Sequence, residues 1–298
     1  MDDGQVERGV ALLLADRRQD TDALVAQRDA CGRAVPDLDQ MMPRDGNLGH
    51  LGGDSMTAIA GETIDEEVFA RFAARHRKLT EIALTASLSH PLAAQGIDTS
   101  AKVFANLGTA PLVEHALKRN EGKLTKDGAL LVDTGKFTGR SVKDKFVVRD
   151  AITEAPINWG PINQPMTVEH WANLKADFMA ALKDQDELYV ADLFGGSQPE
   201  YRVNVRVITQ MAWHSLFVRT LLVRPTADEL ASFAPEYTII NLPSFKANPE
   251  RHGCRSDTVI AVNFTEKLIL IGNTEYSGEM KKGVFGLLNF LLPAQGVM

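Results

Sequence analysis

Cysteine is almost absent from this sequence, and so are long apolar runs. Among the 298 residues only Cys31 and Cys254 are cysteines, which excludes a disulfide framework and predicts a reducing compartment, the cytoplasm. No apolar stretch approaches the roughly 18 residues of a membrane-spanning helix. The formal net charge of −7 argues against nucleic acids and anionic membranes as partners.

Several catalytic signatures are missing as well. The sequence contains no P-loop of the form GxxxxGKS/T, and no HExxH, CxxC, GxSxG or GxGxxG motif. Zinc protease, dithiol redox, serine hydrolase and Rossmann dinucleotide-binding functions therefore have no support in the sequence.

Residues 1–55 differ from the rest of the chain because they contain neither an aromatic residue nor a lysine. Few large side chains are available there to offset the entropy of ordering the backbone. We expect a disordered extension with short helical turns near residues 10–15, ending in a Gly-rich linker over 41–54. A regulatory or targeting tail is the alternative.

From residue 63 onward, helical and strand-like patterns interleave, which predicts a mixed α/β (α+β) domain. Capping-box spacing marks two helix starts, at Thr63 and at Thr226. Further helices are expected with Pro111 in the first turn and Gly122 near the end, over 167–182, near 211–223, and opening at the motif over 276–283. Strands are expected over 130–132, 146–148, 188–193, 202–208, 237–242, 258–263 and 267–272.

The stretch over 133–145, DTGKFTGRSVKDK, combines glycines, threonines and cations directly after a predicted strand. Glycine allows close approach of a ligand to the backbone, and Arg140 offers a planar fork for a carboxylate or phosphate. The pattern is equally compatible with an anion-binding loop and with a solvated basic turn.

The second motif, over 276–283, is YSGEMKKG, which opens an apolar helix. Adjacent Lys281 and Lys282 disfavour each other's charge, and a lysine that becomes neutral can ligate a metal or transfer a proton. Cations are also unfavourable at the positively charged N-terminal end of a helix. An anion bound nearby would explain why two lysines lie there. The alternative is two lysines that face solvent.

Other basic residues favour a structural or surface role in ion pairs over ligand binding. These are Arg202, Arg206, His214, Lys246, Arg251, His252 and Arg255.

Five segments together closely resemble the ATP-dependent phosphoenolpyruvate carboxykinases. They are DTGKFTGRSVKDKFVVRD, WGPINQPM, LFGGSQPEYRVNVRVITQMAWHSLFVRTLLVRP, NLPSFKANPERHGCRSDTVIAVNF and YSGEMKKGVFGLLNFLLPAQGVM. The resemblance runs from Met56 to Met298, with Val142 where the family usually has proline. It implies the family's N-terminal domain over 56–272 and the start of its nucleotide-binding domain over 273–298.

The resemblance implies a reaction in which oxaloacetate and ATP give phosphoenolpyruvate, carbon dioxide and ADP, the entry step of gluconeogenesis. Arg140 would grip the substrate carboxylate, and Tyr276 would position the substrate beside the departing carbon dioxide. Lys282 would ligate Mn²⁺ and contact substrate and the γ-phosphate of ATP, which binds with Mg²⁺. Lys281 would add positive charge at the phosphates.

The family's chain continues with groups that this sequence lacks: a metal-binding histidine, a P-loop, an acidic metal ligand and a second substrate arginine. We therefore expect an incomplete copy without catalytic activity of its own. A non-catalytic fragment that binds small anions or has a regulatory role is the alternative.

Overall fold

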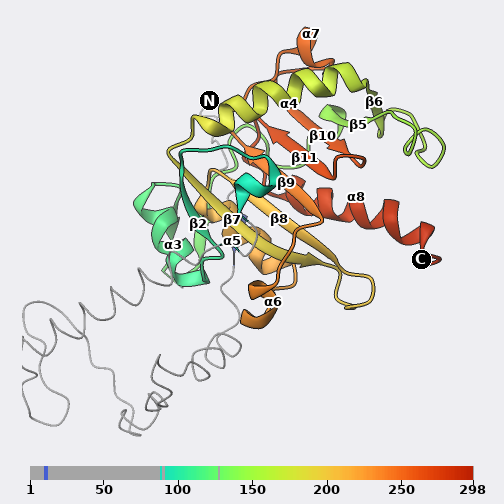
Figure 1. Cartoon of the computed structure of the whole chain (residues 1–298). Coiled ribbons are helices and arrows are strands. Elements are labelled where there is room, and N and C mark those ends of the chain that lie inside the picture. Colours follow the sequence, from blue (N-terminus) through green and yellow to red (C-terminus); the bar gives the residue numbers. More distant parts are fainter. Residues whose placement is uncertain (1–9, 13–87, 89–90, 127, 298) are drawn as a thin grey trace, which may run out of the picture. The chain divides into compact units, whose positions relative to one another are not determined.

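The computed structural model describes residues 10–12, 88, 91–126 and 128–297 (Figure 1). Most of the expected extension over 1–55, the domain start at Met56 and the helix expected at Thr63 lie outside these residues. Strand β1 (Val10–Leu12) pairs antiparallel with β4 (Leu130–Val132), which also pairs with β3 (Gly122–Leu124). The prediction of a helical turn near residue 10 is therefore wrong for residues 10–12, which form a strand.

Eight strands of the described part form a mixed sheet with the order β2-β7-β8-β9-β11-β10-β5-β6. The pairs β7–β8 and β10–β11 are antiparallel, and the other neighbours are parallel. The strands are β2 (Lys102–Ala105), β5 (Lys145–Val148), β6 (Gln164–Met166), β7 (Glu187–Gly195), β8 (Val203–Thr209), β9 (Tyr237–Leu242), β10 (Val259–Asn263) and β11 (Leu268–Gly272). Parallel and antiparallel pairs in one sheet confirm the mixed α/β class.

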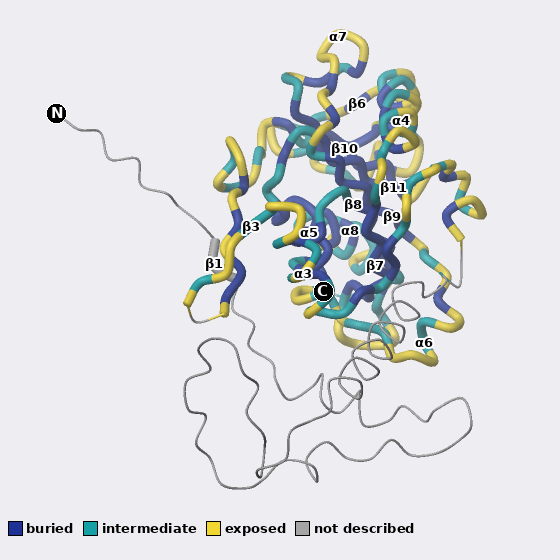
Figure 2. Tube along the Cα trace, turned by 90° about the vertical axis from the view of Figure 1, so that its left-hand side faces the viewer, coloured by how far each residue is buried: buried dark blue, intermediate teal, exposed yellow. Residues whose placement is uncertain are grey.

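Both faces of this sheet are covered, so its central strands are buried throughout (Figure 2). Successive side chains of a strand point to opposite faces. Accordingly, Leu268 and Leu270 of β11 belong to one apolar cluster, whereas Ile269 and Ile271 belong to the other. Strands that are buried on both faces appear in the sequence as continuous apolar runs, and these runs predict the central strands.

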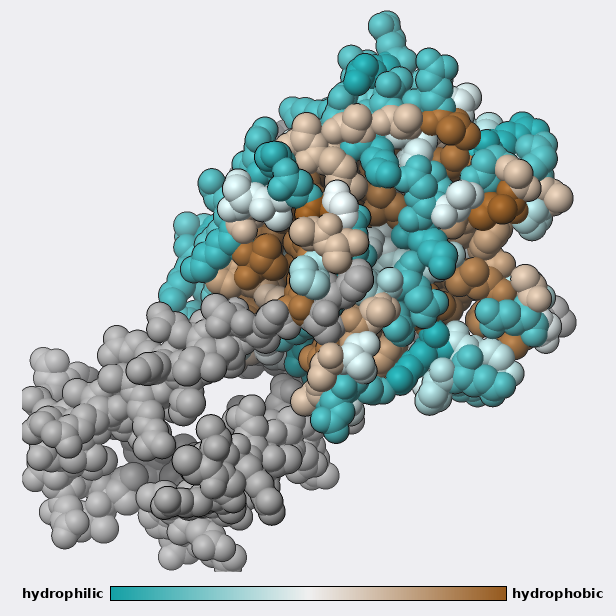
Figure 3. Space-filling view, viewed as in Figure 1, coloured by the Kyte–Doolittle hydropathy of each residue, from teal (hydrophilic) through white to brown (hydrophobic). Residues whose placement is uncertain are grey.

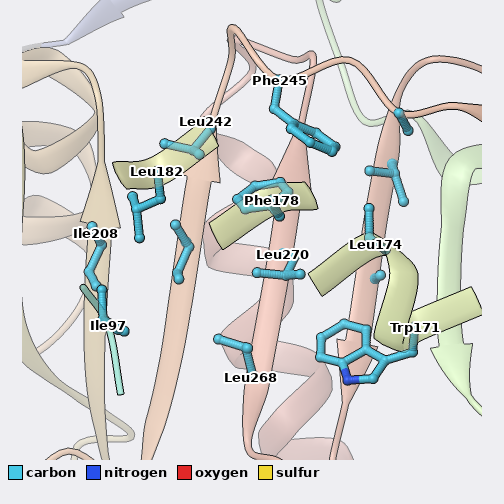
Figure 4. Close-up of a cluster of buried hydrophobic side chains, with 14 of the residues drawn as sticks. Ile97, Trp171, Leu174, Phe178, Leu182, Ile208, Leu242, Phe245, Leu268 and Leu270 are labelled. Carbon is cyan, nitrogen blue, oxygen red and sulfur yellow. The ribbon is translucent and has the colours of Figure 1, made fainter. Parts of the chain in front are cut away.

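Helix α4 (Val168–Lys183) covers the first face. Its buried Trp171, Leu174, Phe178 and Leu182 recur at helical spacing and pack on the sheet (Figure 4). The Thr167 side chain accepts the backbone N–H of His170, which satisfies an unpaired donor at the helix start. The helix expected over 167–182 is confirmed.

The opposite face packs against α8 (Gly278–Ala294), through residues that include Met280, Val284 and Leu287. Helix α5 (Ala212–Leu221) lies against α3 (Thr109–Lys118) and contacts β7 and β8. The described part also contains the short helices α6 (Ala227–Ala231) and α7 (Pro249–His252) and the 3-10 helix η3 (Leu92–Gln95), and Thr226 forms the expected capping box with Glu229. No helix in the described ranges is long and apolar enough to cross a membrane.

The helix expected near Pro111 is confirmed at its start and wrong at its end, because Pro111 lies in the first turn of α3 but the helix does not reach Gly122. It begins at Thr109 and ends at Lys118, where Asn120 adopts a left-handed conformation (φ 56°). Gly122 lies in β3 instead of closing the helix. A Cβ added there would lie 2.6 Å from the Leu131 carbonyl oxygen, so the glycine allows the two strands to approach.

Candidate active site

A cavity of about 540 Å³ lies between α8, the strands β5 and β10, and the loop around 156–163. Four charged side chains line part of it: Arg140, Lys145, Glu279 and Lys282. Most of the other lining residues are apolar, among them Val147, Ile260, Val262 and Phe290. On the face of the molecule seen in the space-filling view, hydrophobic patches alternate with hydrophilic surface (Figure 3).

The loop that carries Arg140 is fixed through its neighbour Ser141. The Ser141 hydroxyl donates to the carboxylate of Asp144, in the short 3-10 helix η4 (Val142–Asp144). Asp144 is 1% exposed and also accepts from Arg255 Nη2 and Ser256 Oγ, each at 2.9 Å. Arg140 itself is exposed and lines the cavity. The hydrogen bonds of its neighbour Ser141 hold the backbone that carries it.

The two adjacent lysines of α8 have different surroundings. Lys282 is half-buried and lines the cavity, with Nζ 4.3 Å from the centroid of the Phe285 ring. Lys281 is exposed and is not among the lining residues. Successive residues of an α-helix are turned by about 100° from each other. The cavity thus brings Arg140 together with Lys282 and leaves Lys281 outside.

Sequence reasoning did not select Lys145 or Glu279, although both belong to the quoted motifs. Burial lowers the pKa of Lys145; Glu279 opposes this shift, whereas Arg140 and Lys282 add to it. Burial raises the pKa of Glu279, while the Ser141 N–H and the neighbouring cations favour its charged form. No signal in the sequence distinguishes Glu279, because an acidic residue in the first turn of a helix is favoured there and needs no further explanation.

Tyr276 precedes α8 and is half-buried, but it does not line the cavity. Its ring lies against Gly278: a Cβ added to that glycine would lie 2.4 Å from Tyr276 Cε1. The Tyr276 backbone N–H donates to Thr274 Oγ1 at 3.1 Å.

His214 of α5 holds the peptide just before this tyrosine. Its Nε2 lies 2.8 Å from the Glu275 carbonyl oxygen, which can only accept, so Nε2 carries the proton. Its Nδ1 lies 3.1 Å from Thr209 Oγ1. Burial lowers the pKa of His214 to about 4, against the opposing effect of the Glu275 hydrogen bond. The histidine is therefore neutral at pH 7.

Within the described ranges, no group of three or more His, Cys, Asp or Glu side chains could hold a metal ion. Among the residues that line the cavity, Glu279 is the one carboxylate, and it already accepts the Ser141 N–H at 2.7 Å; the lining also holds the amines of Lys145 and Lys282 and three asparagine side chains. With one carboxylate and no imidazole, this donor set does not fit a complete Mn²⁺ site, for which several carboxylate or imidazole ligands are typical.

The ion-pair interpretation is confirmed for most of the other basic residues. Arg206 pairs with Asp192, Arg202 with Glu229, Arg251 and His252 with Asp177, and Arg255 with Asp144. Lys246 instead lines a second cavity of about 290 Å³, together with Lys136.

Residues 101–298 match the family model described as phosphoenolpyruvate carboxykinase. A protein of Novosphingobium aromaticivorans named phosphoenolpyruvate carboxykinase (ATP) is 69% identical over 212 residues, covering 71% of this chain and 40% of that protein. A protein of the same name from Brucella suis is 54% identical over 207 residues, covering 70% of this chain and 38% of its own length. One from Afipia carboxidovorans is 53% identical over 203 residues, covering 68% and 37%.

The chain thus spans about 40% of the length of the curated relatives it matches. The family model covers most of the chain, and the relatives share at least half of the aligned residues with it. The resemblance carried by the motifs around Arg140 and Lys282 is confirmed, and the chain belongs to the ATP-dependent phosphoenolpyruvate carboxykinase family.

Proposed function

We propose that this chain supplies the carboxylate-binding part of a phosphoenolpyruvate carboxykinase, which converts oxaloacetate and ATP to phosphoenolpyruvate, carbon dioxide and ADP. One observation carries the proposal: Arg140, Lys145 and Lys282 line a single cavity that contains one carboxylate, Glu279. Three cations facing one anion leave a surplus of positive charge. Oxaloacetate, with two carboxylates, suits such a cavity.

The proposed roles follow from where charge develops in the reaction. Loss of carbon dioxide leaves an enolate, whose oxygen then attacks the γ-phosphorus of ATP. Cations positioned beforehand stabilise both the enolate and the transferring phosphoryl group. Arg140 would hold a substrate carboxylate, and Lys282 would face the enolate oxygen.

Two further residues would act from outside the cavity. Tyr276 would orient the substrate from the turn before α8, and Lys281 would add positive charge for the phosphates from the exposed side of that helix. Both assignments come from the motif alone, since neither residue lines the cavity.

ATP as co-substrate and Mn²⁺ at Lys282 belong to the same proposal. Lys282 would contribute one amine ligand, and further ligands would have to come from groups other than those around it. We also propose a gluconeogenic role in the cytoplasm. In support of a reducing compartment, Cys254 is a free, buried thiol.

Titration calorimetry with oxalate, a stable dicarboxylate, tests the proposed anion site. Arg140→Gln removes a bidentate donor and should weaken binding by about tenfold or more. Lys143→Gln is the matched control, because this exposed lysine lies in the same loop but does not line the cavity. Equal affinities of wild type and Arg140→Gln would overturn the assignment of Arg140.

A coupled assay for phosphoenolpyruvate separates anion binding from catalysis. Residues 1–298 contain no P-loop, so we expect no ATP-dependent formation of phosphoenolpyruvate by this chain alone. Oxalate binding without turnover is the expected pair of results. Turnover by the purified chain would contradict our expectation that it is inactive.

A further inference from the structure

Glu279 connects the two walls of the cavity that carry the cations. It lies in the first turn of α8 and is 5% exposed. Its Oε1 accepts the backbone N–H of Ser141 at 2.7 Å, across 138 positions of sequence. Ser141 directly follows Arg140, and Lys282 lies one helical turn beyond Glu279.

A carboxylate at this place acts against the binding of an anion. It lines the same cavity as Arg140, Lys145 and Lys282, so its charge repels any carboxylate bound by them. Burial also costs free energy for a charged group unless its hydrogen bonds are satisfied. Glu279 has both disadvantages, so its hydrogen bond to Ser141 calls for a structural explanation.

The hydrogen bond between Glu279 and Ser141 affects the spacing of the cations. The loop is already held on one side, because the Ser141 hydroxyl and Asp144 tie it to Arg255 and Ser256. The Glu279 hydrogen bond holds it on the other side, against α8. Without this bond, the Arg140 loop loses its hydrogen bond to α8.

We propose that Glu279 is a positioning residue, whose hydrogen bond to the Ser141 N–H fixes the Arg140 loop against α8 and so sets the spacing of Arg140 and Lys282. This inference rests on the proposed function. Glu279 does not act on the substrate directly. A purely structural role, in which an acidic side chain favours the helix N-terminus, predicts a different response to substitution.

Three substitutions separate these roles when oxalate is titrated calorimetrically into the full chain. Glu279→Gln keeps an acceptor oxygen for the Ser141 N–H, so it should bind oxalate at least about as tightly as wild type. Glu279→Ala removes the acceptor and Glu279→Asp withdraws it by one carbon. Both should bind about tenfold more weakly or worse. Glu250→Gln, an exposed change outside the cavity, controls for lost charge.

The direction in which the oxalate affinity changes decides between a positioning role of Glu279 and a purely electrostatic one. Electrostatics alone predicts that Glu279→Ala binds oxalate more tightly, because a repelling charge is gone. Unchanged or tighter binding by Glu279→Ala and Glu279→Asp would overturn the inference and leave the proposed function intact. Weak binding by Glu279→Gln would overturn it too, because the charge and not the hydrogen bond would then matter. Absence of oxalate binding by wild type would overturn both.

Thermal unfolding of each variant shows whether it folds. If Glu279→Ala does not fold, the comparison of Glu279→Asp with Glu279→Gln decides, since both keep a polar side chain of similar size. Weaker binding by the aspartate variant, restored in the glutamine variant, is the expected result.

Discussion

Asp192 and Arg206 face each other across strands β7 and β8 and form a bidentate ion pair inside the sheet. Arg206 Nε lies 2.7 Å from Asp192 Oδ1, and Nη2 lies 2.7 Å from Oδ2. Both side chains are at most 1% exposed. Arg206 Nη1 also donates to Oε1 of the half-buried Gln95 at 2.9 Å, so the pair belongs to a larger polar network.

Removing one member of this pair should destabilise the fold strongly. Arg206→Met leaves the Asp192 carboxylate buried without its partner, which costs about 3–5 kcal/mol of unfolding free energy. Urea denaturation measures this loss. Lys183→Met is the control, because its pair with Asp98 is exposed and screened by solvent, so its removal should change the stability little. Similar losses in the two variants would contradict the prediction.

Acid should destabilise the protein through His214. Its pKa is about 4 in the folded state, against the ordinary value of 6.5, so the unfolded chain takes up this proton first as the pH falls. The neutral histidine's contribution is complete above pH 6.5, and about 3 kcal/mol is lost by pH 4.

Urea denaturation from pH 7.5 to 4 checks this dependence. Acidic groups titrate in the same window, so the difference between wild type and His214→Gln isolates the histidine. The variant should depend less steeply on pH. Parallel curves for the two proteins would show that His214 does not carry the effect.

Gly278 leaves room for the ring of Tyr276. Gly278→Ala would place a Cβ 2.4 Å from Tyr276 Cε1, so the ring has to move, with an expected loss of about 1–3 kcal/mol. Gly286→Ala in the same helix meets nothing within 4 Å and should gain roughly 0.5–1 kcal/mol from helix propensity. Thermal unfolding ranks the two variants, and equal midpoints would refute the steric argument.

The two lysines of α8 should respond differently to neutralisation. Lys282→Gln removes a cation from the cavity and should weaken oxalate binding by about tenfold. Lys281→Gln removes an exposed charge that solvent and salt screen, so the change should stay within about twofold. Calorimetric titration at moderate salt measures both. A larger effect of Lys281→Gln would reverse the assignment of the inner and outer lysine.

Much of the fold follows from local patterns, because its strands and helices carry their own signals. The Thr167 cap and the apolar spacing from Trp171 to Leu182 locate α4, and the run from Leu268 to Gly272 matches β11. By contrast, β2 and β6 are short strands at the two ends of the sheet as far as the structure describes it, and Pro165 makes the sequence of β6 unlike that of a strand. Their existence depends on neighbours distant in the chain.

The residues of the candidate site divide in the same way, into those that local motifs predict and those whose contacts depend on the tertiary fold. Arg140 and Lys282 could be selected because each lies in a motif whose composition indicates anion binding. The contact of Glu279 with Ser141 could not, since only the tertiary fold brings the two residues together. Which of two adjacent lysines faces the cavity depends on the rotation of α8 about its axis, which packing against the sheet determines.

Pro165 also affects how molecules of this protein meet one another. Among the strands that the structure describes, β6 is the last on its side of the large sheet, and such a strand invites pairing with the edge of another molecule. Proline has no N–H to donate, and Pro165 is the middle residue of the three in β6. A strand arriving from a second molecule would find one donor fewer and little length to pair with. Pro165 thereby makes this strand a poorer template for pairing between molecules.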